Sequence, residues 1–234
     1  MLDLRNCKPG DKLRRRDGGE AWSEPAMIFR GYSGATNGAI ETQAGTLLVP
    51  ISYDVANPGR LVSACIRSTD GGLTWTTSDA VDIGGQGDHG GALEPTVVEL
   101  QDGRIWLIIR TDLGRFFEAF STDQGQTWST PEPTALASPH SPGYILRLAS
   151  GRLAFAWNNT MATSKDRRTM SIAISKDDGQ TWATPVDLAT AEQLSYPYIC
   201  EVIPGRLIVA CQQVHPSWQQ VTPVLMAVSE ADLL

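Results

Sequence analysis

Apolar runs hinged on a glycine recur along this chain at a nearly constant spacing. Each run places small or polar residues at a turn and follows them with consecutive apolar residues. This pattern predicts a β-hairpin with its turn at the glycine and a mostly buried second strand. The four runs cover residues 42–49, 100–107, 148–155 and 203–209, and their glycines are Gly45, Gly103, Gly151 and Gly205.

A polar eight-residue motif alternates with these hairpins. STDGGLTW at 68–75 recurs as STDQGQTW at 121–128 and SKDDGQTW at 175–182, with an eroded copy, RRDGGEAW, at 15–22. The starting positions 15, 68, 121 and 175 are 53, 53 and 54 residues apart. Ser and Asp can accept hydrogen bonds from the N–H groups of a tight turn, and Gly supplies a positive φ there. Repetition favours a structural role for these aspartates over metal binding or catalysis, because an active site is needed only once.

Each period therefore holds about four strands, two around the hairpin and two around the polar turn. Four strands in a period near fifty residues are typical of a β-propeller blade. We expect an all-β propeller of four-stranded antiparallel blades, with about four blades at residues 25–79, 80–131, 132–185 and 186–234. Residues 1–24 would supply outer strands of another blade. The sequence predicts one domain over residues 1–234, either a small closed ring or, as we favour, an N-terminally incomplete piece of a larger one.

The composition of the chain excludes some classes of binding partner. The formal net charge of −7 argues against nucleic acid. No run approaches 18 apolar residues, so no membrane partner is expected, and no signal peptide is visible at the start. The four cysteines (7, 65, 200 and 211) lack metal-type spacing, and free buried thiols are favoured over disulfides. The sequence therefore predicts no metal and no cofactor.

Two polar residues occupy the same place in different repeats. Glu94 and Tyr196 each lie nine residues before a hairpin glycine, where the other two repeats have Thr36 and Pro142. This place falls on the first strand of a blade, which lines the propeller axis. We therefore expect the side chains of Glu94 and Tyr196 to point into one central pocket.

The polar turns resemble the Asp-box repeats of the sialidase (neuraminidase) superfamily. The segment from Glu94 through Arg110 to Trp128 is similar to the family's central catalytic segment, as are residues 167–175 and 195–197. The resemblance covers about residues 15–229 and implies a piece of a six-bladed sialidase-type propeller. It also suggests a secreted or periplasmic protein, and we expect a monomer.

This resemblance implies an exo-α-sialidase-like glycoside hydrolase that releases a terminal sialic acid, or a related acidic sugar, with retention. Tyr196 matches the nucleophile and Glu94 the residue that activates it. Arg110 and Arg168 match two of the three arginines that bind the substrate carboxylate. The residue types suit this chemistry, because a neutral phenol avoids the charge repulsion that a carboxylate nucleophile would meet, and sialidases are known to use a tyrosine. The implied partner is a sialylated or other acidic glycan.

Two functional residues of the family pattern, the first arginine and the general acid, have no clear counterpart in this chain. The first arginine has only a faint counterpart in Arg30, and the general acid has only weak candidates in Asp54 and Asp88. His89 and His140 could offer a proton instead, although loop histidines are more often bystanders. A non-catalytic glycan-binding or scaffold propeller is therefore an alternative, and a propeller lyase acting on a uronate is a weaker one.

Overall fold

The computed structural model describes residues 11–12, 25–56, 59–87, 89–160, 166–215 and 220–234. The eroded polar turn at 15–22, Cys7 and Asp88 lie outside these residues. The described chain consists of β-strands and one 3-10 helix, η2 (Glu230–Leu233). It holds no helix long and apolar enough to cross a membrane.

The strands form successive antiparallel sheets in which neighbours in sequence are neighbours in space. The first blade contains β3 (Ile40–Glu41), β4 (Leu47–Val55), β5 (Arg60–Ser68) and β6 (Thr76–Thr77). The second contains β7 (Leu93–Glu99), β8 (Ile105–Arg110), β9 (Arg115–Ser121) and β10 (Glu132–Ala137). The third contains β11 (Tyr144–Arg147), β12 (Leu153–Trp157), β13 (Thr169–Ser175) and β14 (Val186–Thr190). The fourth has three strands, β15 (Leu194–Ile203), β16 (Arg206–Val214) and β17 (Val221–Ser229). A short pair, β1 (Asp11–Lys12) and β2 (Ala26–Met27), precedes them. The predicted propeller architecture is confirmed.

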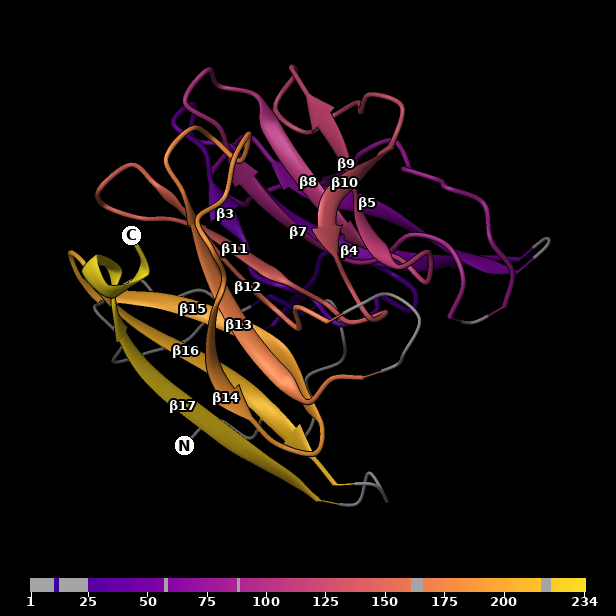
Figure 1. Ribbon diagram of the computed structural model, residues 1–234. Helices are drawn as coiled ribbons and strands as arrows, with labels where there is room; N and C mark the ends of the chain where they lie inside the picture. The colour runs from indigo at the N-terminus through magenta and orange to yellow at the C-terminus, as the bar shows by residue number, and fades with distance from the viewer. Residues whose placement is uncertain (1–10, 13–24, 57–58, 88, 161–165, 216–219) are drawn as a thin grey trace.

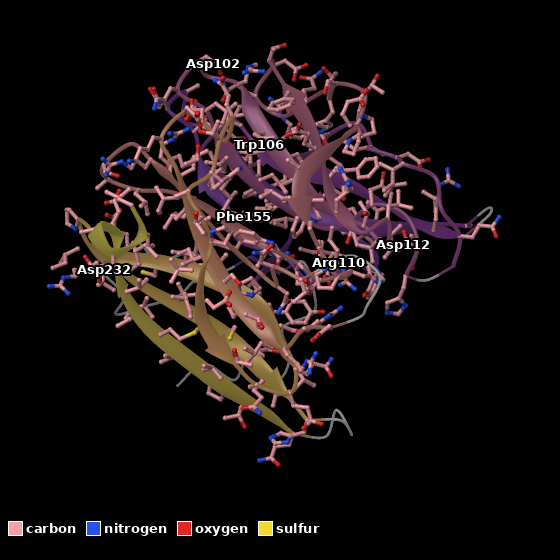
Figure 2. The ribbon with its side chains drawn as sticks, viewed as in Figure 1. Asp102, Trp106, Arg110, Asp112, Phe155 and Asp232 are labelled. Atoms are coloured by element: carbon pink, nitrogen blue, oxygen red, sulfur yellow. The ribbon has the colours of Figure 1, made fainter. Side chains whose placement is uncertain are left out.

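The inner strands of the blades follow one another around a common centre. β4 contacts β7, β7 contacts β11, and β11 contacts β15 (Figure 1). The core lies between the blades, where apolar sheet faces pack together. Trp106 and Phe155 belong to one such cluster and lie in the interior, whereas Asp102 and Asp232 lie at the periphery (Figure 2). This stacking brings residues from distant parts of the sequence to the centre.

The polar turns are stapled as their sequence predicts. In the second blade the Ser121 Oγ accepts a hydrogen bond from the Gly125 N–H at 2.9 Å, and the Asp123 carboxylate accepts one from the Thr127 N–H at 2.9 Å. Gly125 has a φ of 75°, and a Cβ there would come within 2.9 Å of Leu48 in the preceding blade. Glycine is therefore required both by the backbone conformation and by the contact between blades. The described residues hold no group of three or more potential metal ligands.

The cysteines give a mixed outcome. Cys65 and Cys211 are free and buried, as favoured by the sequence. Cys200 is also free but exposed, so the expectation of burial is wrong for this residue.

The stapled turns predict a loss of stability in acid. Hydrogen bonds from the Thr74 hydroxyl and N–H, and then from Ser68, hold the pKa of Asp70 well below its usual range. A depressed pKa favours the folded state above the unfolded pKa of about 4, and this contribution is lost as the pH falls below it. We expect Asp70→Asn to flatten the dependence of the free energy of unfolding on pH between pH 4 and 2. Urea unfolding across this range measures it. Asp79→Asn, at an exposed aspartate outside the turns, is the control, and an equal flattening in both variants would contradict the prediction.

Candidate functional site

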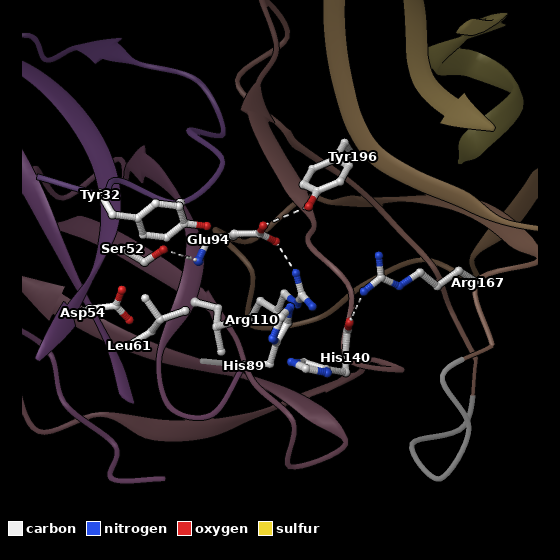
Figure 3. Close-up of a pocket in the computed structure, with 12 residues that line it drawn as sticks. Tyr32, Ser52, Asp54, Leu61, His89, Glu94, Arg110, His140, Arg167 and Tyr196 are labelled. Carbon is white, nitrogen blue, oxygen red and sulfur yellow. Dashed lines mark hydrogen bonds and ion pairs between the residues drawn. The ribbon is translucent and has the colours of Figure 1, made fainter. Parts of the chain in front are cut away.

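A cavity of about 420 Å³ opens where the inner strands converge (Figure 3). All four blades, or the loops that join them, contribute to its wall. Its lining residues are Tyr32, Gly34, Ser52, Asp54, Leu61, His89, Leu93, Glu94, Arg110, His140, Arg167 and Tyr196.

The structure brings Glu94 and Tyr196 into direct contact across this cavity. Glu94 lies on β7 and Tyr196 on β15, and the Tyr196 hydroxyl donates a hydrogen bond to the Glu94 Oε1 at 3.0 Å (Figure 3). The two residues are 102 positions apart in sequence. The geometric expectation from the repeat is met, while the catalytic roles of both residues stay a prediction.

Both residues share an unusual backbone conformation. Glu94 has a φ of 37° and Tyr196 a φ of 56°, each directly before a proline and at a break in strand register. Among the described residues, five that are not glycine have a positive φ. Gln124 and Asp178 lie in the stapled turns, while Glu94, His140 and Tyr196 line the cavity. Such conformations cost about 1–3 kcal/mol each and are often found at functional sites.

Arg110 fixes the other oxygen of the Glu94 carboxylate. It ends β8, is only 4% exposed, and its Nη1 forms an ion pair with the Glu94 Oε2. The Arg110 Nε is buried and has no hydrogen-bond partner among the described residues. A buried charge without a partner is costly, and the ion pair with Glu94 provides the buried guanidinium group with its partner.

The structure places Arg167, and not the predicted Arg168, in the wall of the cavity. Arg168 turns away from the cavity, with its side chain 67% exposed and paired with Asp166 at 2.6 Å. Arg167 lines the cavity instead. Its Nη1 donates to the Ser195 Oγ at 2.9 Å, and its Nη2 donates to the His140 carbonyl at 2.6 Å. Adjacent residues of an extended segment point to opposite sides, so only one of them can face the centre.

The surroundings set the protonation of the cavity. Burial, followed by the negative Glu94 carboxylate, raises the pKa of Tyr196, although Arg110 and Arg167 oppose the shift. Burial and then Arg110 lower the pKa of His140 to about 4. Burial also lowers the pKa of Arg167, which nevertheless stays charged at neutral pH. The cavity therefore holds a protonated phenol, a neutral imidazole and two guanidinium groups, an arrangement suited to an anion.

The other residues considered from the sequence differ in whether they line the cavity. Asp54 is exposed and lines the cavity, whereas Arg30 is exposed and is not among the lining residues. Tyr198, two residues after Tyr196 on β15, packs on Tyr144 with ring centroids 4.5 Å apart. The sequence analysis missed Arg167 in this role, and the adjacent arginine pair was the only signal for it.

Stapled turns, a propeller and a Tyr–Glu contact with two arginines at its centre define the class of protein as an Asp-box propeller. The chain matches the BNR repeat-like domain family over residues 6–209 and belongs to this family. It is 29% identical over 193 residues to the sialidase of Micromonospora viridifaciens. This match covers 71% of the chain but only 28% of that relative's length.

Solved structures show the same fold. A Hadza microbial sialidase superposes with a TM-score of 0.74 at 20% identity, covering 95% of this chain and 44% of that one. The NanB sialidase of Streptococcus pneumoniae superposes with a TM-score of 0.74 at 18% identity, covering 96% of this chain and 36% of that one. The chain is thus similar to a sialidase-family propeller while spanning less than half the length of each of these relatives.

Proposed function

We propose that this chain forms the catalytic part of a sialidase-like glycoside hydrolase that releases a terminal acidic sugar with retention. The observation that carries the proposal is the hydrogen bond from the Tyr196 hydroxyl to the Glu94 carboxylate, made by residues 102 positions apart. The relatives named as sialidases support the substrate class.

Tyr196 acts as the nucleophile and Glu94 as its base. The raised pKa of Tyr196 keeps the phenol protonated and a poor nucleophile by itself, so an adjacent base is needed. Glu94 accepts the phenolic proton as the oxygen attacks the anomeric carbon, and the bond to the leaving-group oxygen breaks while that oxygen takes a proton from solvent. Water then displaces the tyrosine from the sugar and releases one of its protons to solvent, while Glu94 returns the phenolic proton to the departing tyrosine oxygen. Two successive inversions retain the anomeric configuration.

Arg110 and Arg167 hold the substrate carboxylate. Both line the cavity beside Glu94 and Tyr196, and guanidinium groups bind carboxylates through charge-assisted hydrogen bonds. Arg110 also pairs with Glu94, so it orients the base as well as attracting the ligand. A terminal sialic acid, or another sugar with a carboxylate at its reacting carbon, meets these requirements.

The test is turnover of a fluorogenic α-sialoside, with the product anomer followed by proton NMR. We expect release of the α-anomer first, because retention is intrinsic to the tyrosine mechanism. Glu94→Gln should lower kcat by about 10²–10⁴-fold, the usual contribution of a general base. Glu132→Gln, at an exposed glutamate on β10, is the matched control and should behave as the parent.

Two outcomes would overturn the proposal. Initial release of the β-anomer would exclude the tyrosine mechanism. Saturable binding of the sialoside without product on long incubation would identify a glycan-binding propeller instead.

A further inference from the structure

The strained backbone of Glu94 is not held by its own sheet. β7 pairs with β8 at Leu93↔Arg110 and next at Thr96↔Ile108, so the ladder is interrupted at Glu94. Buried backbone polar groups need partners, and those of Glu94 find them in the preceding blade. Its N–H donates to the Ser52 Oγ at 3.1 Å (Figure 3). Its carbonyl accepts a hydrogen bond from the Asn37 Nδ2 at 2.9 Å.

Ser52 and Asn37 are enclosed around this bulge. Ser52 is fully buried and Asn37 is 8% exposed. The backbone of Gly34 lies directly against Ser52, because a Cβ at Gly34 would lie 2.4 Å from the Ser52 Oγ. The side chains of Ser52 and Asn37 therefore meet Glu94 in an enclosed place, one on each polar group of its backbone.

The same place in a later repeat serves the segment that carries Tyr196. Ser52 lies seven residues after its hairpin glycine, Gly45, and Asn158 lies seven after Gly151. The Asn158 Nδ2 donates to the Leu194 carbonyl at 3.2 Å, two residues before Tyr196. Ser52 thus reaches the next blade at the bulge that carries Glu94, whereas Asn158 reaches Leu194, ahead of the break in register between Ser195 and Tyr198. The Asn158 Nδ2 also donates to the Thr169 carbonyl of its own blade, at 2.8 Å.

We propose that Ser52 and Asn37 are positioning residues that fix the left-handed backbone of Glu94, so that its carboxylate meets the Tyr196 hydroxyl. This inference rests on the proposed function, because positioning matters for turnover only if Glu94 and Tyr196 react. It goes beyond that function by assigning the geometry of the couple to residues that touch no substrate.

A purely structural role makes a different prediction. If Ser52 and Asn37 only stabilise the fold, their loss lowers the free energy of unfolding and leaves the couple unchanged in the folded molecules. If they position Glu94, the folded variants hold the carboxylate farther from the phenol. The ionisation of Tyr196 distinguishes the two cases, because the neighbouring Glu94 charge raises the pKa of this phenol.

The experiment uses Ser52→Ala and Asn37→Ala. The protein is labelled with ¹³Cζ-tyrosine, the Tyr196 signal is assigned with Tyr196→Phe, and the phenol is titrated by NMR. We expect the ionisation constant of Tyr196 to rise by about threefold or more in each variant, because an opposing charge moves away. Turnover of the fluorogenic sialoside should fall roughly 10- to 100-fold in kcat, with KM changed less than about twofold because the arginines remain.

Ser63→Ala is the matched control. Ser63 is equally buried and pairs across the strand with Ser52, but its Oγ has no hydrogen-bond partner among the described residues. It should leave both the titration and kcat unchanged. If Ser52→Ala does not fold, Asn37→Ala decides by the same measurements, since it removes the donor to the Glu94 carbonyl without adding a charge.

The outcomes separate the two proposals. A shifted Tyr196 titration in the variants of a protein that shows no turnover would support the positioning and overturn the proposed function. Turnover by the parent protein, with kcat and the Tyr196 titration unchanged in both variants, would overturn the positioning and leave the function intact.

Discussion

Replacing Tyr196 with phenylalanine should lower kcat for a fluorogenic sialoside by at least about 10³-fold, the scale seen when an enzyme loses its nucleophile. The substitution removes one oxygen and keeps the ring, so the cavity wall stays in place. KM should change little, because the guanidinium groups of Arg110 and Arg167 remain to bind the carboxylate. Initial rates over a range of substrate concentrations separate the two parameters.

Tyr198→Phe is the control for this variant. Tyr198 lies two residues further along β15, but its side chain is half-exposed and its ring packs on Tyr144. Loss of its hydroxyl should leave kcat within about twofold of the parent. If Tyr196→Phe kept a tenth or more of the parent kcat, the nucleophile would have to be sought elsewhere.

The fold was predictable because short segments of the sequence determine the turns of each blade. A glycine marks each hairpin, and a stapled turn such as that of Asp123 satisfies its own backbone through neighbouring side chains. Repetition of these local units sets the number and order of the strands. The contact between Glu94 and Tyr196 followed from the same repeat, because equivalent places in stacked blades converge on one centre.

The orientation of the second arginine was not predictable in this way. Arg167 and Arg168 adjoin each other before β13, and nothing local decides which side chain faces inward. The choice depends on the Ser195 hydroxyl and the His140 carbonyl, which come from other segments and are recognised only after folding. Spacing within the repeat could not encode these contacts.

The bulges at Glu94 and Tyr196 depart from the backbone preferences of residues other than glycine. Glu94 and Tyr196 adopt positive φ values although glycine is the residue suited to them. The proline that follows each residue lacks an N–H for the sheet ladder and so indicates the break in register. It does not indicate the positive φ, because proline favours an extended conformation in the residue before it. Departures of this kind are expected where a reactive side chain must leave the regular alternation of a strand.

The second prediction with a large expected effect concerns the adjacent residues Arg167 and Arg168. Arg167→Ala should reduce kcat/KM by roughly 30- to 3,000-fold, because truncating one partner of a buried charge pair costs about 2–5 kcal/mol. Most of the loss should appear in KM, since the carboxylate is held in the ground state as well as in the transition state. Arg168→Ala removes the same charge one position away, where the side chain is exposed and paired with Asp166. Surface ion pairs contribute at most about 1 kcal/mol, so this variant should stay within roughly fivefold of the parent.

The comparison is informative because both variants change the net charge equally. Any long-range effect of charge on substrate association appears in both and cancels in their ratio. The two variants then differ in contact with the carboxylate and in the Arg167 hydrogen bonds to Ser195 and His140. Arg167→Lys refines the test, since a lysine restores the charge without the planar pair of donors. A larger loss for Arg168→Ala than for Arg167→Ala would return the carboxylate-binding role to Arg168 and would require the loop before β13 to rearrange when the substrate binds.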